Sequence, residues 1–292
     1  MSAPVLWSTA GVGESAPERL WQDAADRGWL PADAAQVVIH VYDPDGVGLA
    51  PLTARSLIAH VTSRRAALSV DVIDAKATAS DYPRARLLDL EREPRYTVDT
   101  ACLRDGAPLP ALWLRDFFFV TVAAVAPDAA LGLRSILAAQ GALLAAPDAL
   151  DLDAAFVAHR LMASSLSVAC GHRSARIPAS GSWWALGPED VAVECAVAMS
   201  AGIHPASLPV LRHFARHELP HGFAAADVVD APRLAAYQVP SWRVALARGA
   251  ALAGHRLRQA RTDAVLARRN LRRLPQFLQR RLPALSRLGR SA

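Results

Sequence analysis

A β-branched run, QVVIHVY at 36–42, stops at the turn sequence DPDG and constrains the fold more than any other segment. A helical pattern follows at 51–65, and LSVDVI at 68–73 has the composition of a second strand. A strand, a helix and a strand in such a short stretch form a right-handed crossover, whose two strands are parallel. The segment therefore predicts a parallel strand pair at the centre of a sheet.

The rest of the chain continues the alternation of strands and helices. DFFFVTVAAV at 116–125 is apolar throughout, as expected of a strand that is covered on both faces. We expect further strands at 96–98 and 166–170, helices at 129–144, 152–164, 188–200 and 205–218, and an irregular connection at 171–187. The pattern predicts an α/β fold, with a parallel or mixed sheet flanked by helices.

Charge divides the chain into two parts. Residues 243–292 contain 13 arginines and one acid, a balance of +12, so the first 242 residues carry −7 of the net +5. We therefore expect an α/β domain at 1–242 and a helical, arginine-rich C-terminal extension at 243–292. The body of the protein is mildly acidic.

The extension has an amphipathic pattern that suits three kinds of partner. It could dock onto the acidic body or a partner surface, which is favoured, lie on an anionic membrane surface, or contact nucleic-acid phosphates. Phe277 is the single aromatic residue after Arg243, so stacking on bases has little support and specific nucleic-acid binding is not expected.

Cysteine usage and hydropathy bear on the compartment. Cys102, Cys170 and Cys195 are far apart, which predicts neither a disulfide framework nor a thiolate metal site. The N-terminal sequence lacks the basic and apolar regions of a secretion signal. The apolar run at 117–126 is well short of the roughly 20 residues of a spanning helix. A cytoplasmic protein is expected, with a peripheral membrane association as the alternative.

Three segments carry a shared pattern. They are QVVIHVYDPDG with the following helix and LSVDVIDA, then WLRDFFFVTVAAV with LGLRSIL, and finally PEDVAVECAVAMSAGIHPASLPVLRHFARH. In this order they resemble the family called domain of unknown function 362. The third is similar to the family's pattern of an acidic helix start, an alanine-rich face and a G-I-x-P exit. The resemblance covers about residues 36–218 and implies an α/β scaffold.

Several polar positions of that family are changed here. Val41 to Pro44 stand where a lysine-proline-asparagine loop is typical, and Arg134 with Ser135 occupies the place of a lysine-asparagine pair. The resemblance thus makes Arg134 a candidate ligand-binding residue. Lys76 is the chain's one lysine. Some relatives carry iron–sulfur modules, and the three dispersed cysteines lead us to expect no iron–sulfur cluster here.

Asp190 and Glu194 are the candidate catalytic residues. They are four apart in a predicted helix, so they share one face near its N-terminal end. Two such carboxylates could share a proton or hold a divalent metal ion. The alternative is that Asp190 complements the helix dipole and that Glu194 is solvated.

Other candidates follow the first two strands. Asp43 and Asp45 flank the turn after the first strand, and Asp74 ends the second. α/β proteins bind ligands at this carboxyl edge, although ordinary turn chemistry explains Asp43 and Asp45 equally well. Asp43 and Asp74, with Arg134, are therefore predicted to bind a ligand.

His213 and His217 have the i, i+4 spacing of a metal pair, with Glu218 as a further ligand, but the sequence lacks the glutamate of H-E-x-x-H. The alternative to a metal site is that these are surface histidines that alternate with arginines.

Two hypotheses about function stay open from the sequence. The chain is an enzyme or ligand-binding accessory of small-molecule metabolism, or a non-catalytic scaffold that kept the fold and lost the polar site.

Overall fold

The computed structural model describes residues 4–11, 17–99, 106–128, 132–144, 152–174, 177–217 and 234. The chain divides into two units, Met1–Pro240 and Ser241–Ala292, and the second lies wholly outside the described residues. The arginine-rich extension expected after Arg243 lies outside the described residues. No helix within the described ranges is long and apolar enough to cross a membrane.

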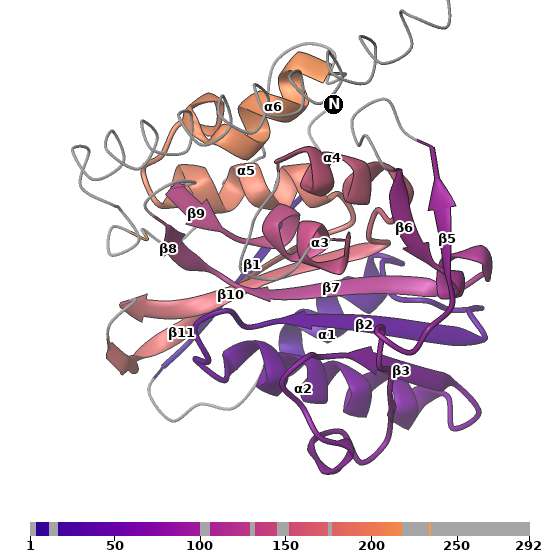
Figure 1. Cartoon of the computed structure of the whole chain (residues 1–292). Helices are drawn as coiled ribbons and strands as arrows, with labels where there is room; N and C mark the ends of the chain where they lie inside the picture. Colours follow the sequence, from indigo (N-terminus) through magenta and orange to yellow (C-terminus); the bar gives the residue numbers. More distant parts are fainter. Residues whose placement is uncertain are drawn as a thin grey trace, which may run out of the picture. The chain divides into compact units, whose positions relative to one another are not determined.

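A mixed sheet of seven strands forms the centre of the described structure (Figure 1). Its order is β1-β11-β10-β7-β2-β3-β4, and β11 alone is antiparallel to its neighbours. The strands are β1 (Leu6–Ala10), β2 (Gln36–Tyr42), β3 (Ser69–Ile73), β4 (Arg86–Leu87), β7 (Phe118–Ala124), β10 (Leu166–Ser174) and β11 (Ile177–Gly187). Two small hairpins pair β5 (Arg95–Val98) with β6 (Ala107–Pro110), and β8 (Ala126–Asp128) with β9 (Gly132–Arg134).

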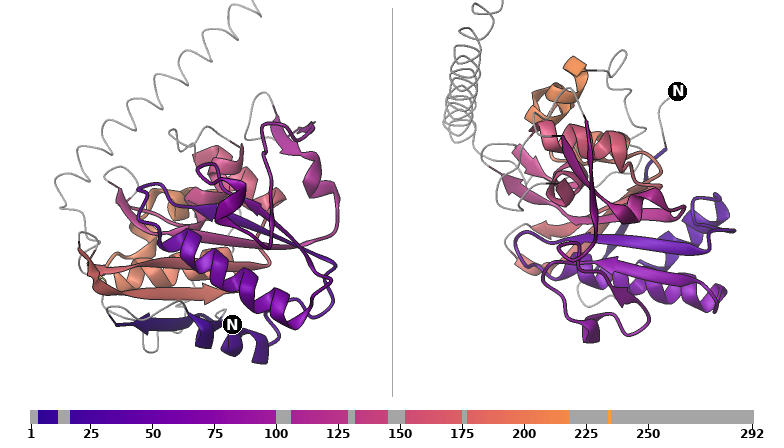
Figure 2. Two further views of the ribbon diagram at one scale, coloured as in Figure 1. Left: turned by 90° about the horizontal axis from the view of Figure 1, so that it is seen from below. Right: turned by 45° about the vertical axis from the view of Figure 1, so that its right-hand side comes forward.

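Helices cover both faces of this sheet, which confirms the predicted fold class. They are α1 (Glu18–Asp26), α2 (Leu49–Arg64), α3 (Ile136–Leu144), α4 (Leu152–Leu161), α5 (Asp190–Ser200) and α6 (Pro209–His217), with short 3-10 turns at Ala79–Asp81, Ala111–Leu114 and Pro205–Ser207. α1 and α2 lie on one face, and α3, α4 and α5 lie on the other (Figure 2). In β2, Val37 and Ile39 pack on the first side, while Val38 and Tyr42 pack on the second. This double burial explains why the strand is mostly apolar, with His40 as a buried polar exception.

The direction of winding changes between β2 and β7. The chain passes from β2 through α2 to β3 on one side, and from β7 through α3 and α4 to β10 on the other. The crossovers therefore lie on opposite faces, and the loops after β2 and β7 separate at their carboxyl ends. Such a switch point is where open α/β sheets bind ligands.

Two expectations about elements were wrong. The predicted connection at 171–187 is the antiparallel hairpin of β10 and β11, in which Trp183 and Trp184 are buried on opposite faces. Aromatic side chains on both faces suit a central strand, so the glycines and prolines of this segment misled the prediction. The helix expected at 129–144 begins only at Ile136, because Gly132–Arg134 pairs with β8.

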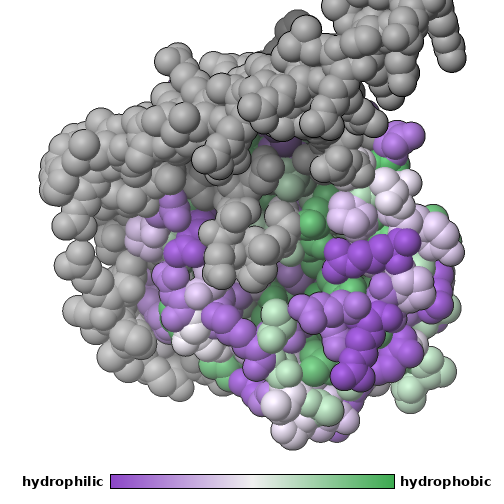
Figure 3. Space-filling model, in the orientation of Figure 1, coloured by the Kyte–Doolittle hydropathy of each residue, from purple (hydrophilic) through white to green (hydrophobic). Residues whose placement is uncertain are grey.

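Figure 3 shows the surface of the protein in the orientation of Figure 1. Hydrophilic side chains cover the right of the surface seen there, and hydrophobic ones gather toward its middle.

Gly141 permits the close approach of α3 and α4. A Cβ atom at this position would lie 3.1 Å from the Cβ and 3.2 Å from the Cα of Ala155. We expect Gly141→Val to lower the free energy of unfolding by about 2 kcal/mol, since the helices would have to move apart. Urea denaturation measures the effect. Ala142→Val, on the half-buried neighbour, is the control, and equal losses in the two variants would contradict the packing argument.

Candidate functional site

The loop between β2 and α2 is held by Asp43. Its Oδ1 accepts the backbone N–H of Val47 at 2.9 Å, and its Oδ2 accepts that of Gly48 at 2.6 Å. Gly48 has a φ of 81°, a left-handed conformation that suits glycine. The carboxylate predicted to bind a ligand therefore also shapes its own loop at the switch point.

Asp74 and Lys76 connect the end of β3 to this loop. The Lys76 ammonium donates to the carbonyl oxygens of Asp43 at 2.7 Å and Pro44 at 3.1 Å. Asp74 accepts the backbone N–H of Lys76 at 3.0 Å and the hydroxyl of Tyr82 at 2.8 Å. Burial and this hydrogen bond raise the pKa of Tyr82. The structure thus brings Asp43 and Asp74 to one edge of the sheet, as the sequence predicted.

Arg134 completes this edge from the β8–β9 hairpin. Its Nη2 donates to Asp45 Oδ1 at 3.0 Å, and its Nε lies 3.3 Å from Asp128 Oδ2. One guanidinium therefore bridges the loop after β2 and the strand after β7. Asp128 was not among the sequence candidates, although its position after the apolar strand was a usable signal.

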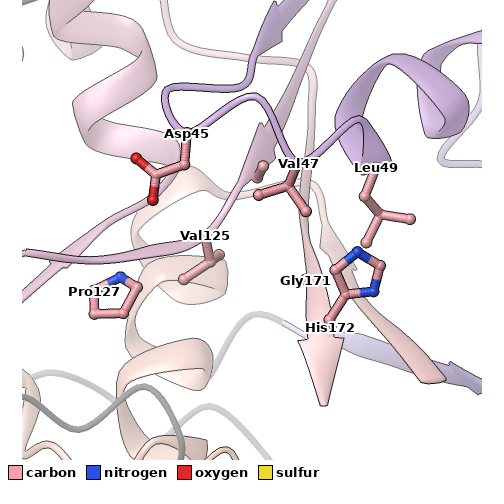
Figure 4. Close-up of a pocket in the computed structure, with 8 residues that line it drawn as sticks. Asp45, Val47, Leu49, Val125, Pro127, Gly171 and His172 are labelled. Carbon is pink, nitrogen blue, oxygen red and sulfur yellow. The ribbon is translucent and has the colours of Figure 1, made fainter. Parts of the chain in front are cut away.

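A shallow pocket opens at the switch point, beside this ion-paired cluster (Figure 4). Its wall is mostly apolar, with one carboxylate and one imidazole. The lining residues are Asp45, Val47, Leu49, Ala124, Val125, Pro127, Gly171 and His172. Figure 4 shows Asp45 and His172 at opposite ends of the group, with Val47 and Val125 between them. The pocket lies at the carboxyl ends of β2, β7 and β10.

His172 is the functional candidate that the sequence reasoning missed. It belongs to β10, which continues beyond the predicted end at Cys170, and its Nδ1 lies 3.2 Å from Ser182 Oγ on β11. This contact orients the ring, as partners of catalytic histidines do. The assignment of 171–187 to a connection concealed the residue, because nothing local placed it beside the β2 loop.

Asp190 lies away from this pocket, in a buried polar network. Its side chain is 2% exposed. It accepts hydrogen bonds from Gln140 Nε2 at 2.5 Å, from Ser164 N at 3.2 Å and from Ser167 Oγ, and His159 Nδ1 lies 3.1 Å away. These partners come from α3, α4 and the start of β10, so Asp190 joins three elements at the amino end of β10.

Glu194 lies one turn further along α5, against the start of α3. Its Oε2 accepts the backbone N–H of Leu137 at 3.3 Å, so the carboxyl group caps that helix. Burial raises its pKa to about 7, and the N–H groups of Leu137 and Ile136 and the Ser135 side chain partly offset this. The two acids share a helix face, as predicted, but they contact separate sets of protein groups. Their catalytic role stays a prediction.

Of the predicted metal pair, His213 and His217, the structure describes the side chain of His213. His213 Nε2 lies 3.0 Å from Asp153 Oδ1, which links α6 to α4. The side chain of His217, like all of Glu218, lies outside the described residues. In the part of the chain that the structure describes, no group of three histidine, cysteine or acidic side chains converges as a metal site would. A metal at this pair therefore stays a prediction.

Comparison of the chain with known proteins found no match. No family model matches the chain, and neither a curated protein nor a solved structure is similar to it.

Proposed function

We propose that the protein binds and acts on a small organic molecule in the switch-point pocket. The observation that carries this proposal is the meeting of Asp45, His172 and an apolar wall at the carboxyl edge where the winding of the sheet reverses. Pockets of this kind combine apolar surface with a few polar groups that orient the ligand. The position is also the one that ligands occupy in open α/β sheets.

The polar groups support proton-transfer chemistry. An imidazole exchanges protons near neutral pH, and Ser182 holds the ring of His172 from its Nδ1 side. Asp45 is held in turn by Arg134. In this proposal His172 gives a proton to the ligand or takes one from it, and Asp45 orients the ligand at the other end of the pocket.

A thermal-shift panel tests this proposal without knowledge of the substrate. Amines, carboxylic acids, polyols, nucleosides and divalent cations are added one at a time to the full chain. At least one compound is expected to raise the melting temperature, because a ligand that binds the folded state stabilises it. Val47→Trp would fill the pocket and abolish that rise.

The control variant is Met199→Trp, which changes another exposed apolar side chain, on α5. It should keep the response of the unmodified protein. If no compound stabilises the protein, or if Val47→Trp leaves the response intact, the pocket is not the site.

A non-catalytic scaffold is the second candidate function. The observation in its favour is that Asp190 and Glu194 hold α3, α4 and β10 together through hydrogen bonds. The acids that follow the family pattern would then support the fold alone. This alternative predicts that the whole panel gives no stabilisation.

A further inference from the structure

Acidic side chains outnumber basic ones among the described residues beside the switch-point pocket. The loop after β2, the start of the loop after β3 and the β8–β9 hairpin after β7 carry the carboxylates of Asp43, Asp45, Asp74 and Asp128 and the cations of Lys76 and Arg134. Lys76 donates to backbone carbonyl oxygens, and Arg134 is shared by Asp45 and Asp128. These six side chains sum to −2, and a loop edge of this sign attracts cations.

Arg173 is a further cation near the carboxyl end of β10. Arg173 follows His172 in β10, and its Cδ would lie 3.6 Å from a Cβ at Gly181, so the side chain runs along the neighbouring strand. Together with Arg173, the seven described side chains named here sum to −1. Asp45 is the one carboxylate among the lining residues, and its Oδ1 is paired with Arg134.

Apolar surface extends from the pocket along α2. Val47 is 42% exposed, and Leu52 is 51% exposed one turn beyond the lining residue Leu49. Residues three apart on a helix are neighbours, so Leu49 and Leu52 form one surface. Isolated exposed apolar residues need no explanation, but a group beside a pocket indicates that a ligand covers it.

We infer that the ligand is a small amine with an apolar body. Its ammonium group pairs with Asp45, and its carbon skeleton lies over Val47, Leu49 and Val125 toward Leu52. This inference rests on the proposed function, since it names the class of molecule for the same pocket. A carboxylate of the same size would meet Asp45 and a negative edge.

Three probes with one carbon skeleton separate charge from hydrophobicity. Butylammonium, butan-1-ol and butyrate are titrated into the full chain at constant ionic strength, and binding is followed by the melting temperature and by calorimetry. Butylammonium is expected to bind about fivefold more tightly than butan-1-ol, which is the effect of a partly exposed ion pair. Butyrate is expected to bind most weakly.

Two substitutions locate the effect. Asp45→Asn should reduce the affinity for butylammonium to that for butan-1-ol. Asp23→Asn, which changes an exposed acid on α1 outside the pocket lining, should retain the preference. The amine assignment is overturned if butyrate binds best or if Asp45→Asn changes nothing.

The same measurements distinguish this failure from failure of the proposed function. If a neutral or acidic compound binds and Val47→Trp abolishes that binding, the pocket stands and the amine class is wrong. If neither the probes nor the wider panel stabilise the protein, both proposals fail. Binding of butylammonium that survives Val47→Trp also contradicts both, because the amine would then bind elsewhere.

Discussion

Asp190→Ala is expected to lower the free energy of unfolding by about 3–5 kcal/mol, since it removes the shared acceptor of a buried network. Gln140, Ser164 and Ser167 would keep their buried donors and lose the carboxylate that binds them. Their desolvation would no longer be compensated. Urea denaturation followed by circular dichroism gives the change directly.

Asp153→Ala is the matched control for this prediction. Asp153 also pairs with a histidine, His213, but it is partly exposed. Its removal is expected to cost less than about 1 kcal/mol. Similar losses in both variants would mean that the Asp190 network contributes no more to folding than a surface pair. Because the effect concerns folding, any test of Asp190 in catalysis needs a stability measurement beside it.

Glu194→Gln is expected to stabilise the protein at pH 8 and to have little effect at pH 4.5. The folded-state pKa of about 7 lies above the ordinary 4.5, so the folded protein holds the proton more tightly than the unfolded chain. The contribution of the Glu194 carboxyl group to the free energy of unfolding is therefore largest below about pH 4.5, and it is lost as the pH rises to about 7. The full loss corresponds to about 3 kcal/mol. Glutamine is neutral at every pH and can still accept the N–H of Leu137.

Unfolding measured at pH 4.5, 6 and 8 tests this expectation. The difference between Glu194→Gln and the unmodified protein should grow with pH and level off above about 7. Glu189→Gln, which changes an exposed acid just before α5, should show no such growth. A difference independent of pH would show that folding does not raise the pKa of Glu194.

The sequence predicted the elements whose patterns are local. The apolar runs of β2 and β7 and the turn after Tyr42 were sufficient to place these strands, and parallel strands carry their following loops to one edge. For that reason Asp43 and Asp74 could be placed together in advance. β1 was missed, because a five-residue strand at an edge gives little periodic signal.

Long-range partners explain the remaining failures. Glu194 caps Leu137 from 57 positions away, and Arg134 reaches Asp45 across 89. No spacing rule covers such separations. The same limit hid His172, whose place beside the β2 loop depends on the order of strands in the sheet. Burial of Asp190 was also unexpected, since an acid at a helix start is commonly solvated.

The place of β1 in the sheet has a consequence for the order of folding. Leu6 pairs with Leu186, so β1 leaves the ribosome well before its partner, which lies 180 residues further along the chain. Until β11 is synthesised, the segment Leu6–Ala10 is an unpaired edge that must be kept from other chains. The parallel strands β2, β3 and β7 are complete long before this and can assemble first. Closing the sheet with β1 must therefore await β11, and it joins two strands that are far apart in the chain.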